Sequence, residues 1–205
     1  MPDPAPTARP EDDLAFIRRV MEGARETASD GSGHLILWGC LLATAQTLTY
    51  LVRHGEMAIP VTVIWAVTVG VGFAGSSLLG NRNVKRAPVN SLVNRILSSI
   101  WIGCGLSLSL IGFLGQGFGA LPHQVAPGIE AVVIGTSFFA SAMLPNHAIY
   151  WLLAAAWWIL GGVLLVGPSP VSNLVIACGL VLLMVVPGVV LRARRRVRLA
   201  VHLVA

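Results

Sequence analysis

Six long apolar runs separated by short polar segments dominate the hydrophobic pattern of this chain. Each run is close to the roughly 20 residues that an α-helix needs to cross about 30 Å of hydrocarbon. An unpaired backbone amide is costly in lipid, so each run is expected to be helical throughout. The pattern therefore predicts an all-α, polytopic membrane bundle of six transmembrane helices. The predicted spans are about 34–52, 59–79, 92–115, 126–144, 148–166 and 171–191.

A segment with a different pattern precedes the first run. Residues 1–10 are proline-rich and carry no apolar periodicity, which is typical of a disordered tail. Over about 11–28, apolar side chains recur at helical spacing opposite a charged face, which predicts an amphipathic helix. Such a helix lies on the membrane surface or docks onto a partner. Residues 1–33 thus form a tail and a surface helix before the transmembrane domain of 34–191.

Arginine and lysine residues place the predicted helices in the membrane. They gather in the N-terminal segment, in the loop between the second and third runs, and in the tail of 192–205, all on one side of the predicted topology. Only Arg53 falls on the other side. The positive-inside rule makes the first side cytoplasmic, so a multi-pass protein of the cytoplasmic (inner) membrane with both termini inside is expected. The tail is predicted to be a basic interfacial segment, in which Arg192, Arg195 and Arg196 share a face suited to anionic lipid headgroups.

The composition supports the membrane interpretation and excludes other classes. Of 205 residues, 55% are hydrophobic and only 11% are charged, too few to cover the surface of a water-soluble protein. The net charge of +5 is explained by the basic clusters beside the runs, so the expected partner is the lipid bilayer and not a nucleic acid. Many glycines lie within the runs, where small residues let helices approach closely within one subunit or in a homo-oligomer.

No pattern for a metal, a cofactor or catalysis is visible in the sequence. Cys40, Cys104 and Cys178 each stand alone within an apolar run, without the spacing of a zinc or redox site. His34 and His54 are twenty residues apart on one predicted helix, about 30 Å, which is the wrong geometry for holding haem inside a bundle. Signatures such as HExxH and GxSxG are also missing. We therefore expect a protein that is not an enzyme and that has no cofactor.

Glu130 is the only acidic side chain within any of the six runs. Ionisable groups inside transmembrane helices are expensive, and they often mark the path of a proton or an ion. A second interpretation is structural: Glu130 follows the helix-start residues Ala126, Pro127 and Gly128, and a carboxylate in a first turn near the headgroups complements the helix dipole. The sequence favours this second interpretation.

Other polar side chains on the predicted extracytoplasmic side could join Glu130. Along the first predicted helix and just beyond the end of its run, Gln46, Tyr50 and His54 recur at four-residue spacing and form a polar stripe that ends at that surface. His123 lies in a predicted loop on the same side. These five residues are candidates for lining a pathway or vestibule. Glu130 is expected to have a chemical role only if this stripe faces it.

The layout of the chain resembles a group of uncharacterised small bacterial six-span integral membrane proteins. The resemblance rests on the segment FIRRVME at 16–22, on ILWG at 36–39, and on Pro187-Gly188 followed by a basic tail. It implies six spans and an N-terminal cytoplasmic amphipathic helix, and it implies no activity.

Two functions follow as hypotheses. The first is a non-enzymatic membrane protein that acts on a cytoplasmic protein partner through the N-terminal helix. The alternative is a small transporter or channel with an extracytoplasmic vestibule near Glu130.

Overall fold

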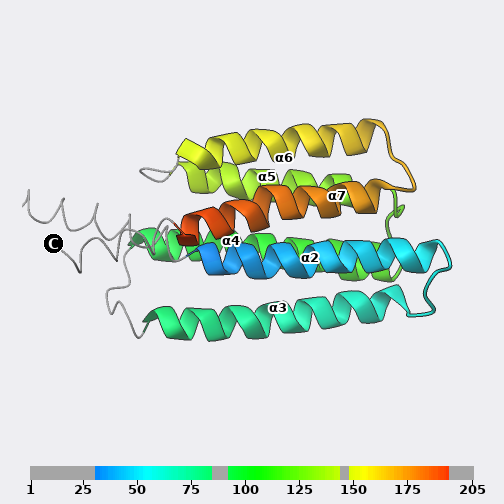
Figure 1. The fold of residues 1–205 in the computed structure, drawn as a ribbon, viewed down its shortest axis with the longest axis horizontal. Coiled ribbons are helices and arrows are strands. Elements are labelled where there is room, and N and C mark those ends of the chain that lie inside the picture. The colour runs from blue at the N-terminus through cyan, green and yellow to red at the C-terminus, as the bar shows by residue number, and fades with distance from the viewer. Residues whose placement is uncertain (1–30, 85–91, 144–147, 194–205) are drawn as a thin grey trace, which may run out of the picture.

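The computed structural model describes residues 31–84, 92–143 and 148–193, and this part of the chain is all-helical without a strand. The predicted surface helix over about 11–28, and Arg195 and Arg196 of the tail, lie outside the described residues. Figure 1 shows the helices running side by side as an elongated bundle. The elements are α2 (Ser32–Arg53), α3 (Val61–Val84), α4 (Leu92–Leu110), the π-helix η1 (Ile111–Gly117), α5 (Ala126–Ala142), α6 (Ala148–Val166), α7 (Ser172–Leu180) and the π-helix η2 (Val181–Val185).

Five of the helical segments are long and apolar enough to cross a membrane: Ser32–Arg53, Val61–Gly80, Arg95–Gly117, Ile149–Val166 and Ser172–Ala193. The remaining apolar helix, α5, is shorter, with 17 residues. These segments agree with the predicted runs to within a few residues. The prediction of an all-helical membrane protein is thus confirmed as far as length and composition can show it.

The outer surface of the bundle is apolar, as expected for helices that face hydrocarbon. On α6, Leu152 is 71% exposed and Ile159 is 68% exposed, and Val163 and Val166 continue the same face. A water-soluble bundle would carry charged side chains at such positions. An apolar surface of this kind suits contact with lipid, so these residues can face outward without another helix packed against them.

The centre of the bundle is filled by large side chains from different helices. Trp65 of α3, Phe138 of α5, Trp157 of α6 and Ile176 of α7 are all fully buried. Figure 1 shows α2 and α7 beside each other, with α5 and α6 on one side of this pair and α3 on the other. The apolar core therefore joins segments from the whole length of the chain.

Glycine residues set how closely some helices approach. A Cβ atom added to Gly112 would lie 2.1 Å from the Trp65 ring, so only glycine leaves room for the buried tryptophan. A Cβ atom at Gly161 of α6 would lie 3.2 Å from the carbonyl oxygen of Gly128 in α5. Gly103 faces open space, with no atom within 4 Å of the added Cβ. Close approach thus explains some of the glycines in the runs and not others.

Two runs that were expected to be α-helical throughout contain π-helical turns. The turn in η2 ends two residues before Pro187. Proline has no N–H to donate, and its ring collides with the carbonyl four residues earlier, so a widened turn relieves both problems. The next proline after η1 is Pro122, too far along the chain to explain the π-helical turn that carries Gln116. Such π-helical turns are frequent at functional sites.

Candidate functional site: a carboxylate–amide ring

One end of the bundle collects the buried carboxylate and the buried amide side chains of the described residues. At this end α2 and η1 stop and α5 and α7 begin, because consecutive helices run in opposite directions (Figure 1). The segments 54–60, 118–125 and 167–171 connect the helices here. We refer to it as the Arg53 end, after the last residue of α2.

Glu130 lies inside this end of the bundle and not at its rim. It is the fifth residue of α5, so it falls beyond the first turn, and it is only 2% exposed. Its carboxylate oxygens accept hydrogen bonds from side-chain amides, not from the backbone N–H groups of a helix start. The structure therefore does not place Glu130 in the first turn of α5, where the favoured sequence interpretation put it. Helix packing, which the local sequence does not reveal, buries the group.

Two glutamines hold the carboxylate from opposite sides. Nε2 of Gln46, in α2, donates to Oε2 of Glu130. Nε2 of Gln116, in η1, donates to Oε1 of Glu130 over 2.7 Å. Each carboxylate oxygen therefore has its own amide donor, and the three side chains come from three separate segments of the chain.

Asn173 completes the arrangement from a fourth segment, α7. Its Nδ2 donates to Oε1 of Gln46 and, over 3.1 Å, to Oε1 of Gln116. The four side chains thus form a closed ring of four hydrogen bonds, which we call the carboxylate–amide ring. Its three amide side chains are 0–1% exposed. All four hydrogen bonds are directed from Asn173 through the glutamines toward Glu130.

Local structure fixes the position of two ring members. Nη2 of Arg53 donates to the backbone carbonyl of Gln116 over 3.2 Å and ties the end of η1 to the end of α2. Asn173 is the second residue of α7. The turn before it is stabilised where the backbone N–H of Ser169 donates to Oγ of Ser172 over 3.0 Å.

The hydrogen bonds of the ring are directed toward an ionised Glu130. A carboxylate accepts twice, so all four hydrogen bonds are made. A protonated carboxyl would donate to Gln46 through one oxygen, and the ring then keeps four hydrogen bonds if the Gln46 amide is turned over and donates to Oδ1 of Asn173. No side chain among the described residues forms a salt bridge with Glu130. Burying an unpaired charge is costly, so the site favours neutralisation of Glu130, either by a proton or by a bound cation.

The other residues of the predicted vestibule lie outside the ring. Tyr50 is half-buried and His54 is exposed, and their rings stack with centroids 3.9 Å apart. His123 is partly exposed in the loop before α5. No hydrogen bond joins Tyr50, His54 or His123 to the ring in the part of the chain that the structure describes. Of the predicted stripe, Gln46 alone contacts Glu130.

Two members of the ring, Gln116 and Asn173, were not found by sequence reasoning. Gln116 lies one residue beyond the predicted end of the third run, and Asn173 lies two residues after the predicted start of the sixth. The predicted topology puts both of these ends on the same side as Glu130. A search for uncharged amides at run ends on that side would have selected them.

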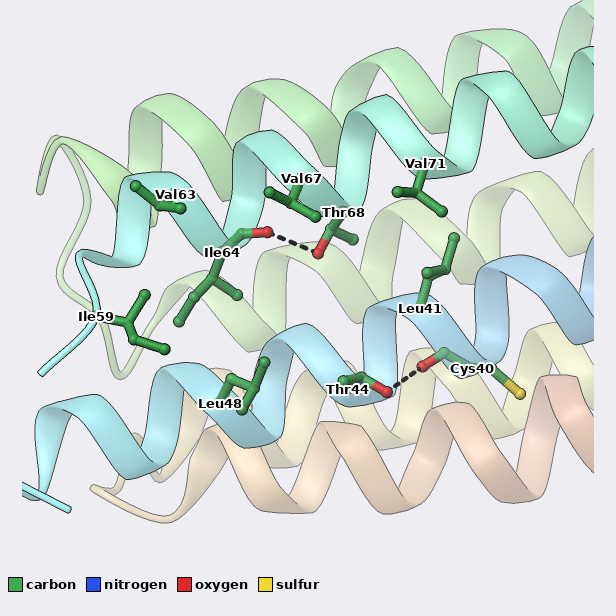
Figure 2. A pocket seen from close by; sticks show the side chains of 10 residues that line it. All are labelled: Cys40, Leu41, Thr44, Leu48, Ile59, Val63, Ile64, Val67, Thr68 and Val71. Atoms are coloured by element: carbon green, nitrogen blue, oxygen red, sulfur yellow. Dashed lines mark hydrogen bonds between the residues drawn. The ribbon is translucent and has the colours of Figure 1, made fainter. Parts of the chain in front are cut away.

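A groove on the outer surface is a weaker candidate for a site. It has a volume of about 370 Å³ and lies between α2 and α3 (Figure 2). The hydroxyls of Thr44 and Thr68 are bonded to carbonyls of their own helices, so the free thiol of Cys40 is the polar group that the groove offers. Thr44 and Gln46 are two residues apart and point to nearly opposite sides of α2. The groove therefore faces away from the ring.

The described ranges contain no group of three or more histidine, cysteine, aspartate or glutamate side chains that could hold a metal ion. The three cysteines are free, Cys104 being buried and the other two exposed. Arg192, a predicted headgroup contact, is exposed at the end of the described chain.

No family model matches the chain, and neither a curated protein nor a solved structure was found that matches it. The resemblance to small bacterial six-span proteins therefore stays a prediction.

Proposed function

We propose that this protein is a small transporter or channel of the cytoplasmic membrane, with six spans and both termini inside, that binds a cation at Glu130 during transport. The carboxylate–amide ring is the observation that carries this proposal. In a bundle that only anchored a cytoplasmic domain, amides alone would suffice to join the helices, and an ionisable side chain would not be needed. Each of these groups costs free energy to bury in a membrane protein, and buried ionisable groups there often mark ion pathways.

The composition of the ring also supports movement as part of the function. Its members come from four segments, α2, η1, α5 and α7, so the state of Glu130 affects how all four pack together. A cation that arrives or leaves changes the charge at the point where these segments meet. Transport by alternating access requires such a link between the occupancy of a site and the packing of helices.

Three features support the six-span arrangement within this proposal. The 17 residues of α5 are at the short end of the range for a span. Figure 1 shows α5 extending beside α6 along the bundle. Arg53 is the only basic residue of the chain that the predicted topology leaves outside.

Flux measurements in proteoliposomes test the proposal. Vesicles with purified protein receive an inward gradient of sodium or of protons, and ion entry is followed with a fluorescent indicator. We expect flux above that of empty vesicles, and we expect Glu130→Gln to reduce it at least about tenfold, because the neutral side chain cannot attract a cation. Glu56→Gln is the matched control, since Glu56 is exposed in the loop 54–60 at the same end. Equal flux in both variants would remove Glu130 from the pathway, and flux no greater than in empty vesicles would refute the class.

The hypothesis of an interaction protein depends on the helix predicted over about 11–28, outside the described residues. It stays a prediction, and its test is separate. Deletion of residues 1–30 should abolish crosslinking to a cytoplasmic partner if that helix carries the function.

A further inference from the structure

We infer that the carboxylate–amide ring is a binding site for a dehydrated monovalent metal cation of the sodium type. This inference rests on the proposed function and names the class of cation that the site would take. It starts from what the ring offers beyond a carboxylate, namely free lone pairs on three buried amide oxygens and a buried hydroxyl without a partner one turn from Gln46.

The ring supplies more oxygen ligands than a proton needs. A carboxylate has about four lone-pair positions, and the hydrogen bonds from Gln46 and Gln116 use two of them. An amide oxygen has two lone pairs. Oε1 of each glutamine uses one of its pairs for the hydrogen bond from Asn173, and Oδ1 of Asn173 uses neither. Free lone pairs therefore remain on all four side chains.

Thr49 provides an independent observation. It is fully buried, and its Oγ1 has no hydrogen-bond partner. Thr44, Thr47 and Thr68 bond to the carbonyl four residues earlier in their own helices, so an unbonded buried hydroxyl is an exception here. Thr49 lies three residues after Gln46, on the same face of α2. A buried hydroxyl without a partner, about one turn from Gln46 along α2, is a candidate for a further ligand of the cation.

Charge and ligand type select the class of cation. The ring holds a single negative charge, which a monovalent ion neutralises, whereas a divalent ion would leave a net positive charge in the bundle. Carboxylate, amide and hydroxyl oxygens are hard ligands, which suit alkali and alkaline-earth ions better than transition metals. A proton is the main competitor, and a metal ion differs from it because the ion can use the free lone pairs of several oxygens at once.

Thermal unfolding of the full-length protein in detergent tests the inference. Sodium chloride is raised at constant ionic strength by replacing choline chloride, with parallel series in lithium, potassium and caesium. We expect a saturating rise in Tm with sodium, about 3–6 °C at ten times the half-saturating concentration. Potassium or caesium should need a higher concentration for the same rise. Glu130→Gln should lose the response, Thr49→Ala should shift it to higher sodium, and Glu56→Gln should keep it.

The wild-type series decides the question even if a ring variant fails to fold. Equal Tm values in sodium and choline would overturn the inference. A rise in Tm on acidification without any effect of sodium would assign Glu130 to a proton instead and would leave the proposed transport function standing. Besides Tyr50, the titratable or charged groups that the described residues bring to this end are Arg53, His54, Glu56 and His123, and none of them bonds to Glu130. Sodium binding without flux would refute the proposed transport function and would leave the inferred sodium site standing.

Discussion

Asn173 is the member of the ring whose removal gives the clearest prediction for stability. Its Nδ2 makes two of the four hydrogen bonds, and it carries no charge whose burial would complicate the result. Asn173→Leu removes both bonds and leaves Oε1 of Gln46 and Oε1 of Gln116 without this donor. Because both glutamines are buried, water does not replace it.

The size of the effect depends on the environment of the ring. In water-soluble proteins each buried polar group that loses its partner costs about 1–3 kcal/mol. Hydrogen bonds between helices in a bilayer are worth about 0.6 kcal/mol on average and up to about 1.7 kcal/mol, because separated helices in lipid find other partners. The ring joins apolar helices of the membrane type, so the second scale applies. With two bonds lost, the free energy of unfolding should fall by about 1–3 kcal/mol.

Equilibrium unfolding in mixed micelles with increasing SDS, followed by tryptophan fluorescence, measures this change. Thr136→Val is the control, because the Thr136 hydroxyl is exposed and bonds only to the Val132 carbonyl of its own helix. Asn173→Ala separates the loss of hydrogen bonds from any strain caused by the larger leucine. A loss below about 0.5 kcal/mol in both Asn173 variants, or a loss equal to that of the control, would show that the ring does not hold these helices together.

Two further predictions concern the core and the loop before α5. Gly112→Ala should lower the free energy of unfolding by about 1–3 kcal/mol in the same assay, because its Cβ would collide with Trp65. Gly103→Ala in the same run should be neutral or stabilise by up to about 1 kcal/mol, and equal losses in both variants would contradict the packing argument. The pKa of His123 is held below its ordinary value by partial burial and then by the nearby Arg53 and His54. Removing one of these charges in Arg53→Gln should raise the pKa of His123 toward about 6.5 in an NMR titration, and an unchanged pKa would refute the influence of Arg53.

The sequence by itself determined the class of the fold. Apolar runs of span length must be helical, because lipid offers no partner for backbone N–H and C=O groups. This constraint acts on each segment separately, so it can be applied without knowing the neighbours. The predicted run 92–115 corresponds to helical residues Leu92–Gly117, and 171–191 corresponds to Ser172–Ala193. The π-helical turn before Pro187 also has a local cause in the missing N–H of proline.

The tertiary structure alone decided the surroundings of Glu130. Gln46 is 84 residues away along the chain, and Asn173 is 127 residues from Gln46. Contacts over such separations depend on which helices are neighbours and on how each is rotated, and apolar periodicity does not specify either. The local pattern at Ala126 therefore suggested an acid at a helix start, whereas packing put Glu130 one turn deeper, among three amides. Arrangement in space, and not the rarity of the residue, makes Glu130 a candidate for binding a cation.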